Sequence, residues 1–326
     1  MKKLVIIMML AILAGSAFGQ AKVLMRVGDI ENISNLGAIA LDRFADSVAK
    51  QSGGDFEVRA FHASQLGEAS KQLELVKSGT LQAFRCSISW LADFDTGFSL
   101  TDFPFTAGNP EQAKAIANSP GLQKLNEKLA KEHGIRFVTA GWTRLPRQIL
   151  LSKPIKSVED LKGVKLRVPG AYSYIQSFKA LGATPTPVAF AETYLALKQG
   201  VVDGAENHVE SLYNMKWYES AKHLVITDHS YDITGFMVND AWWKKLTEAQ
   251  RKMVVDTFYE VDQWFIKENE NLQQYYIDLM VKEGVKVYKL DKESFRRKVY
   301  PMVMEQAERD GEWQKGLWAE VQALLK

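Results

Sequence analysis

Cysteine is almost absent from this chain of 326 residues, which contains only Cys86. One cysteine cannot form an internal disulfide, and a chain of this length can bury enough apolar surface to fold without one. Histidine is also scarce, and the five histidines do not fall at the spacings of metal-binding motifs. We therefore expect neither a disulfide-stabilised scaffold nor a metal centre, and no cofactor.

The common catalytic and phosphate-binding motifs are also missing. There is no Gly-rich phosphate loop, no H-E-x-x-H, no G-x-S-x-G and no C-x-x-C. No block of basic residues stands out, which argues against nucleic acid as a partner. One catalytic alternative stays open, an exported hydrolase or lyase acting on a small carboxylate through Asp203 and Glu206. A buried strand and a tight turn at Gly204 would instead make both carboxylates structural.

The first residues carry an export pattern. Two lysines after Met1 precede an apolar run over residues 4–14, and small residues follow at Ala17 and Gly19. This arrangement is typical of a secretory signal peptide. A membrane anchor is the alternative, but the run is well short of the ~20 residues that a spanning helix needs. We predict a signal peptide over residues 1–19 and a periplasmic mature chain.

The apolar periodicity predicts an α/β protein that opens with a β-α-β-α-β series. Residues 22–27, 56–61 and 83–88 read as strands, and helical spacing separates them, which indicates a parallel sheet. Later in the chain a helical pattern runs from Thr247 to near Gly284. At 1.5 Å per residue it would cover ~50 Å, enough to cross two domains.

Two polar side chains lie close to strand ends. Arg167 ends a short strand over residues 164–168, and Asn207 follows the next strand-like run. Ligands of open α/β sheets bind at the carboxyl ends of strands. A guanidinium is a two-pronged donor suited to a carboxylate, and Asn adds a donor and an acceptor. Residue types alone leave open the alternative that Arg167 pairs internally with Glu192 or Asp203.

Three motifs around these residues resemble a known family. They read K-L-R-V-P at 165–169, G-A-T-P-T-P at 182–187 and F-A-E-T-Y-L-A-L-K-Q-G-V-V-D-G-A-E-N at 190–207. They are similar to the signature of the DctP-type solute-binding proteins of tripartite ATP-independent periplasmic (TRAP) transporters. The sequences S-Q-L-G at 64–67 and D-F-P-F at 102–105 extend the resemblance over the whole mature chain.

The resemblance implies a periplasmic-binding-protein-like clamp of two domains, with crossing strands at the hinge and a long helix spanning both. We place domain I at residues 20–144 plus 233–272, and domain II at residues 145–232 plus 273–326. The implied function is capture of a small organic acid by hinged closure and delivery to the integral membrane subunits of a TRAP transporter. We expect a monomer without enzymatic activity.

The resemblance also adds residues to the ligand site. Arg147 matches a second arginine in the cleft of the sialic-acid-binding members, and Phe190 matches an aromatic residue that lies against the ligand. Residue type alone would make Arg147 a solvated turn residue, with Arg144 close enough to take its place in the alignment. For Phe190, residue type alone leaves a position in the hydrophobic core as an equally open alternative.

The remaining candidates are polar or aromatic residues that could face the cleft. Trp90 follows the third strand and could pack on a ligand, although core or hinge packing is the alternative. The polar candidates are Ser89, Glu31 and Asp232. Those on the domain I side suit hydroxyl groups better than a second carboxylate. We therefore favour a sugar acid, such as a hexuronate or an aldonate, over a C4-dicarboxylate.

Overall fold

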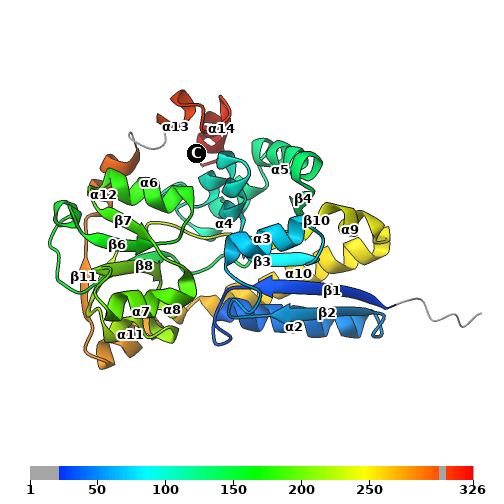
Figure 1. The fold of residues 1–326 in the computed structure, drawn as a ribbon, viewed down its shortest axis with the longest axis horizontal. Coiled ribbons are helices and arrows are strands. Elements are labelled where there is room, and N and C mark those ends of the chain that lie inside the picture. Colours follow the sequence, from blue (N-terminus) through cyan, green and yellow to red (C-terminus); the bar gives the residue numbers. More distant parts are fainter. Residues whose placement is uncertain (1–21, 301–305, 326) are drawn as a thin grey trace, which may run out of the picture.

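The computed structural model describes residues 22–300 and 306–325. Within these residues the chain forms two mixed α/β lobes that lie side by side, each built on its own sheet (Figure 1). No helix of the described residues is both long and apolar enough to cross a membrane. The predicted signal peptide, residues 1–19, lies outside the described residues.

The first lobe contains a five-stranded sheet with the order β2-β1-β3-β10-β4. Its strands are β1 (Val23–Asp29), β2 (Phe56–Phe61), β3 (Ala83–Ser87), β4 (Ile135–Phe137) and β10 (Thr234–Asn239). β1 pairs in parallel with both β2 and β3, which confirms the predicted opening series. β10 returns from the second lobe and pairs antiparallel to β3 and β4.

Helices cover both faces of this sheet (Figure 1). They are α2 (Leu36–Gln51), α3 (Ala69–Lys77), α4 (Pro110–Ala117), α5 (Pro120–His133) and α9 (Asp240–Lys245), with 3-10 turns η1 (Ile88–Asp93) and η2 (Thr96–Thr101). Proline at the first turn and a side-chain cap from Asn109 or Ser119 start α4 and α5. Aromatic rings fill the core, where Trp142 stacks on Phe258 with ring centroids 4.5 Å apart.

The second lobe contains a six-stranded sheet with the order β11-β9-β5-β8-β6-β7. Its strands are β5 (Arg147–Leu151), β6 (Lys165–Val168), β7 (Thr184–Pro187), β8 (Gly204–His208), β9 (His223–Ile226) and β11 (Lys286–Lys289). Its helices are α6 (Tyr172–Ala180), α7 (Thr193–Lys198), α8 (Val209–Asn214) and α12 (Lys292–Val299), with 3-10 turns η3 (Val158–Leu161), η4 (Phe190–Glu192) and η5 (Trp217–Glu219).

The strand predicted just before Asn207 begins later than expected. Residues 201–203 form a turn with Val201 exposed, and the strand β8 contains Asn207 rather than preceding it. Gly204 allows this pairing, because a Cβ there would lie 2.5 Å from the carbonyl oxygen of Leu150 on β5. Only glycine leaves room for the two strands at that point.

Two segments connect the lobes, one between β4 and β5 and one between β9 and β10. They run together, with the Arg144 N–H donating to the Asp232 carbonyl and the Arg147 N–H donating to the Ser230 carbonyl. Gly141 and Thr234 form an isolated antiparallel bridge. The predicted crossing of the chain at the hinge is therefore confirmed.

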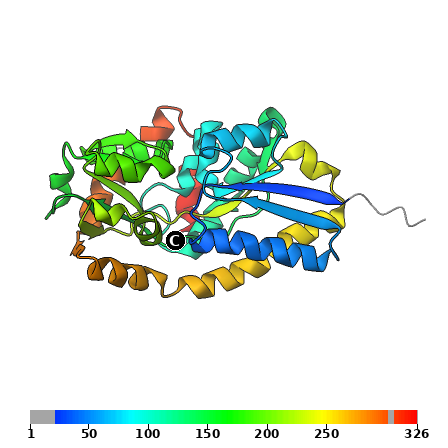
Figure 2. The same ribbon diagram turned by 60° about the horizontal axis from the view of Figure 1, so that its bottom comes forward.

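The helical pattern predicted from Thr247 to near Gly284 spans both lobes, but it is two helices rather than one. α10 (Glu248–Asn269) packs on α2 of the first lobe, and α11 (Leu272–Lys282) packs on α8 of the second. Figure 2 shows both along one side of the molecule. The break at residues 270–271 lets each helix follow its own lobe.

The C-terminal helices α13 (Gln306–Arg309) and α14 (Leu317–Leu324) return toward the first lobe. α14 packs on α4, and the Gly121 N–H donates to Glu320 Oε1 at 2.7 Å. These contacts favour grouping α14, residues 317–324, with the first lobe, whereas the sequence analysis places residues 273–326 in domain II. The domain boundaries otherwise stay a prediction.

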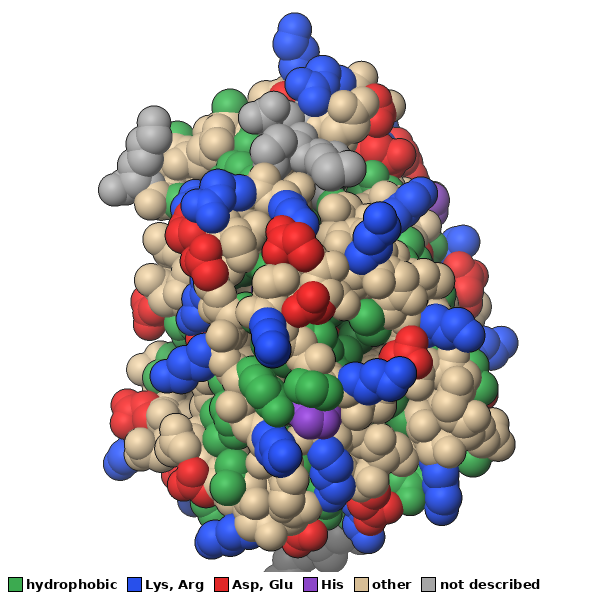
Figure 3. Space-filling model, turned by 90° about the vertical axis from the view of Figure 1, so that its left-hand side faces the viewer, with side chains coloured by type: hydrophobic (Ala, Val, Ile, Leu, Met, Phe, Trp, Pro, Cys, Tyr) green, Lys and Arg blue, Asp and Glu red, His purple; other side chains and the backbone are tan. Residues whose placement is uncertain are grey.

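On the end of the second lobe that faces away from the first, cationic and anionic side chains are interspersed (Figure 3).

Candidate functional site

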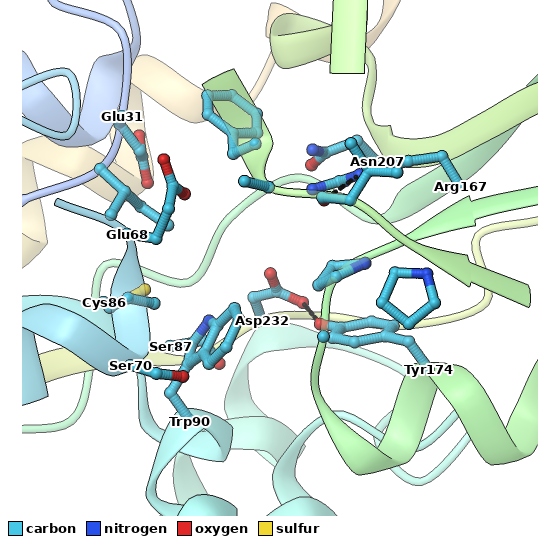
Figure 4. Close-up of a pocket in the computed structure, with 18 of the residues that line it drawn as sticks. Glu31, Glu68, Ser70, Cys86, Ser87, Trp90, Arg167, Tyr174, Asn207 and Asp232 are labelled. Atoms are coloured by element: carbon cyan, nitrogen blue, oxygen red, sulfur yellow. Dashed lines mark hydrogen bonds between the residues drawn. The ribbon is translucent and has the colours of Figure 1, made fainter. Parts of the chain in front are cut away.

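A cavity of about 250 Å³ lies between the two lobes (Figure 4). Seven of the eight predicted ligand-binding residues line it, namely Arg167, Asn207, Arg147, Phe190, Trp90, Glu31 and Asp232. They come from both lobes and from the segment that precedes β10. The size suits a small organic molecule enclosed on several sides.

Arg167 on β6 is buried and has no ion pair within the described residues. Its Nε donates to the carbonyl of Val188 at 3.0 Å, and its guanidinium lies 5.3 Å from the ring centroid of Trp217. Nη1 is buried without a hydrogen-bond partner. Burial lowers the pKa of Arg167 to about 10. The side chain is therefore a largely unsatisfied cation in the wall of the cavity.

The alternative partners of Arg167 are engaged elsewhere or form no ion pair with it. Asp203 accepts the backbone N–H of Lys165 at 2.9 Å, and Glu192 forms no ion pair among the described residues. Burying an arginine without an ion-pair partner costs free energy, and an anionic ligand that pairs with it would offset that cost. Pairing of Arg167 with Glu192 or Asp203 is therefore not what this structure shows.

Arg147 also lines the cavity, but its charge is balanced within the protein. It lies on β5, where Nε donates to Glu206 Oε2 at 2.6 Å and Nη2 donates to Glu206 Oε1 at 2.7 Å. Its Nη1 donates to Asp232 Oδ2 at 2.9 Å, and its guanidinium lies 4.4 Å from the ring centroid of Tyr174. Arg147 is buried, so the interpretation as a solvated turn residue is wrong.

The ion pair with Arg147 also fixes the charge of Glu206. Burial alone would raise its pKa, but Arg147 lowers the pKa of Glu206 to about 2. A carboxylate with so low a pKa is a poor proton acceptor near neutral pH. Glu206 is therefore a poor candidate base for the hydrolase or lyase alternative, and neither Glu206 nor Asp203 lines this cavity.

Asn207 lies beside Arg167 on the second-lobe wall (Figure 4). Its Oδ1 accepts the backbone N–H of His208 at 2.8 Å. The amide NH₂ group makes no hydrogen bond to the described residues and can donate to a ligand. Arg167 and Asn207 together give this wall several hydrogen-bond donors.

A network of buried hydroxyl and carboxyl groups lies below the cavity. The Tyr174 hydroxyl is 2.6 Å from Asp102 Oδ2 and 3.0 Å from Asp232 Oδ1. Burial and the nearby Asp232 raise the pKa of Asp102 to about 7. One phenolic hydrogen cannot serve two carboxylates, so a proton on Asp102 would satisfy both contacts.

Ser89 is the one predicted residue that does not line the cavity. It is buried at the start of η1, and its hydroxyl donates to Asp102. Ser87, two residues earlier on β3, lines the cavity instead and donates to Asp102 at 3.0 Å. The hydroxyl of Ser89 thus belongs to the network below the cavity.

The first-lobe wall is acidic. Glu31 lies 2.8 Å from Arg85 Nη2 and 3.4 Å from Arg144 Nε. Glu68, which the sequence analysis missed, lines the same wall directly before α3. The S-Q-L-G motif at residues 64–67, which is part of the family resemblance, ends directly before Glu68. Its position could have indicated that Glu68 belongs to the site.

Aromatic side chains from both lobes complete the lining. Trp90 of η1 and Phe190 of η4 are partly buried and face the cavity. Phe190 also packs on Trp217 with ring centroids 5.5 Å apart. Tyr174 of α6, which the sequence does not single out, is a further lining residue.

Comparisons with known proteins agree with this geometry. The family model for bacterial extracellular solute-binding proteins, family 7 (DctP), matches residues 28–310. A TRAP periplasmic solute-binding protein from Ochrobacterium anthropi, solved with bound L-fuconate, is 30% identical with a TM-score of 0.86, over 94% of this chain and 100% of that one.

Two further structures of TRAP periplasmic solute-binding proteins are similar. The protein from Actinobacillus succinogenes, solved with bound L-galactonate, is 27% identical with a TM-score of 0.87, over 93% of this chain and 99% of that one. The protein from Fusobacterium nucleatum, solved with bound sn-glycerol 3-phosphate, is 27% identical with a TM-score of 0.85, over 93% and 97%. All three resemble the chain over nearly its whole length.

Proposed function

The chain belongs to family 7 of the bacterial extracellular solute-binding proteins, and we propose that it captures a sugar acid, a hexuronate or an aldonate, between its lobes. The observation that carries this proposal is Arg167, a buried guanidinium with one unbonded nitrogen in the cavity wall. A carboxylate is the group that a planar, two-pronged donor of this kind binds best.

The rest of the cavity supports a hydroxylated ligand. Glu31, Glu68 and Ser87 offer acceptors for hydroxyl groups on the first-lobe side. Two of the similar structures hold L-fuconate and L-galactonate, which are sugar acids, and the third holds a phosphate ester. In this chain the buried cation Arg167 suits an anion of either kind, and the polar first-lobe wall favours a sugar acid.

Affinity in this proposal comes from enclosure by both lobes. Micromolar to nanomolar binding corresponds to roughly 8–12 kcal/mol. One charge-assisted hydrogen bond contributes about 1.5–3 kcal/mol, so Arg167 cannot supply that alone. Asn207, Trp90 and Phe190 would add hydrogen bonds and ring contacts once the lobes close on the ligand.

The cellular role follows from the family. A solute-binding protein of this kind works outside the cytoplasmic membrane, in the periplasm. It delivers its ligand to the integral membrane subunits of a TRAP transporter. We propose that this chain does so as a monomer without turning over its ligand.

Mass spectrometry of purified protein tests the proposal directly. A retained, chemically unmodified sugar acid, displaced on unfolding and rebound in a calorimetric titration, is the expected result. Failure of every hexuronate and aldonate to bind ligand-free protein would contradict the proposed substrate class. Conversion of a bound acid into a product would favour the enzyme alternative.

A further inference from the structure

Six charged residues described by the structure line the cavity, and they differ in whether their charge is balanced. They are Glu31, Glu68, Arg144, Arg147, Arg167 and Asp232. Four of these take part in ion pairs: Glu31 with Arg85 and Arg144, and Arg147 with Asp232 and Glu206. Arg167 and Glu68 are the two without an ion pair among the described residues.

These two charges have opposite signs, belong to different lobes and attract one another across the cavity without forming an ion pair. Arg167 lies on β6 of the second lobe, and Glu68 directly precedes α3 of the first. Figure 4 shows the carboxylates of Glu31 and Glu68 together on one side of the cavity, with Arg167 and Asn207 on the other. The cavity is therefore polarised along the line between the lobes.

The Glu68 side chain does not cap the helix that it precedes. Glu68 occupies the N-cap position of α3, yet its carboxylate makes no capping hydrogen bond to that helix. Burial raises the pKa of Glu68, and the backbone N–H of Phe190 opposes that shift. The carboxylate therefore lies in the cavity wall close to Phe190 of the second lobe, where a donor on a ligand can reach it.

We propose that Glu68 determines specificity at the end of the ligand that lies away from Arg167, by accepting hydroxyl groups and rejecting a second negative charge. This inference rests on the proposed function, because Arg167 must bind the carboxylate. The ligand is then a monoanion whose far end carries hydroxyl donors. Dicarboxylates of the same length, such as aldarates, bind more weakly.

Electrostatics gives the direction of the effect. A second carboxylate beside Glu68 would bring two like charges together in a partly desolvated site, where their repulsion is much larger than in water. Because Glu68 is partly exposed, screening reduces this effect, and we expect discrimination on the order of tenfold or more. A hydroxyl group in the same place donates to Glu68 without repulsion.

Galactonate and galactarate form a matched pair of probes, since they differ only in having a hydroxymethyl group or a carboxylate at the far end. Calorimetric titration of the full mature chain, freed of retained ligand, should show about tenfold or greater preference for galactonate. Glu68→Gln removes the charge and keeps an acceptor. It should bring the two affinities to within about threefold, mainly through tighter binding of galactarate.

Glu74→Gln is the matched control, because Glu74 lies on the same helix α3, is exposed and does not line the cavity. It should leave the preference unchanged. A preference that is the same in Glu68→Gln and wild type would overturn the inference, as would equal binding of both probes by the wild type. Tighter binding of 6-aminohexanoate than of galactonate would overturn the hydroxyl assignment and indicate a cationic far end.

The outcome separates this inference from the proposed function. If wild type binds galactonate, Arg167→Ala weakens that binding about thirtyfold or more, and Glu68→Gln changes nothing, only the role of Glu68 is wrong. If no sugar acid binds, the proposed substrate class is wrong. The role of Glu68 can then be tested in the same way with lactate, a shorter monoanion, and malate, a shorter dianion. Failure to bind any of these acids would contradict both.

Discussion

Arg147 and Glu206 are diagonal neighbours on the antiparallel pair β5 and β8, where Arg147 lies opposite His208, and they share two hydrogen bonds of 2.6 and 2.7 Å. This contact separates the roles of the two arginines of the cleft. Both line the cavity and both are buried, but Arg147 is neutralised by carboxylates of its own lobe and hinge, whereas Arg167 is not. One arginine is built into the fold, and the other is available to a ligand.

The first prediction concerns the stability of the fold. Arg147→Ala should lower the free energy of unfolding of the ligand-free protein by about 3–5 kcal/mol, because Glu206 and Asp232 would be buried without their counter-charge. Urea unfolding measures this. A variant that unfolds at the same urea concentration as the wild type would show that water or another cation replaces Arg147.

The different roles of these two arginines could not be predicted from the sequence. Alternating apolar residues were enough to predict β1, β2 and β3 and their parallel pairing, because one face of each strand had to be buried. Arg147 and Arg167 are both strand residues, and their difference comes from the register of β5 against β8, which brings Glu206 beside Arg147. Register between distant strands is not visible in local periodicity.

Other deviations have the same origin. Ser87 and Ser89 differ by two residues, and only the turn into η1 decides which hydroxyl reaches the cavity. The helical period continues through residues 270–271, so the pattern could not reveal the break between α10 and α11. Glu68 precedes a helix and has no feature of its own that marks it as a cleft residue, because its place in the cavity wall depends on the approach of the other lobe.

The second prediction concerns pH. Glu210 of α8 accepts the Leu36 N–H at the start of α2 across the two lobes, at 2.6 Å. Burial, with the nearby Glu31, raises the pKa of Glu210 to about 7. A carboxyl group with a raised pKa in the folded state contributes stability below its ordinary pKa, and this contribution is lost as pH rises toward 7.

Glu210→Gln keeps the acceptor for Leu36 and removes the titration. Between pH 4.5 and 7 the unfolding free energy of the wild type should therefore fall relative to that of Glu210→Gln, by roughly 1.4 kcal/mol per pH unit at most. Urea unfolding of both proteins at pH 5 and pH 8, without ligand, gives the difference. The exposed Glu74→Gln variant should show none. A constant difference between Glu210→Gln and wild type at both pH values would contradict the assignment.

The third prediction concerns closure. The lobes are connected by two crossing segments and by the break between α10 and α11, which allows rotation of one lobe against the other. A binding acid should reduce the radius of gyration in small-angle scattering of protein freed of ligand. Arg167→Ala at the same acid concentration is the control and should keep the ligand-free profile. An unchanged wild-type profile at saturation would argue against a hinged clamp.

The fourth prediction concerns export and lies outside the described residues. Signal cleavage should leave a mature chain that begins near Gln20 or Ala21, recovered in the periplasmic fraction. Intact mass measurement of the exported protein identifies that end. Recovery of the uncleaved chain from the membrane as the mature form would contradict it.

The central claim is that Arg167 binds the carboxylate of the ligand, and calorimetric titration of Arg167→Ala beside thermal unfolding of the ligand-free variant tests it most directly. We predict a loss of affinity of 2 kcal/mol or more, about thirtyfold, with an unchanged or higher melting temperature, because the mutation removes a buried cation that has no carboxylate partner. Arg167→Lys should also bind poorly, since an ammonium lacks the two-pronged geometry. Wild-type affinity together with a lowered melting temperature would make Arg167 a structural residue and contradict the proposed site.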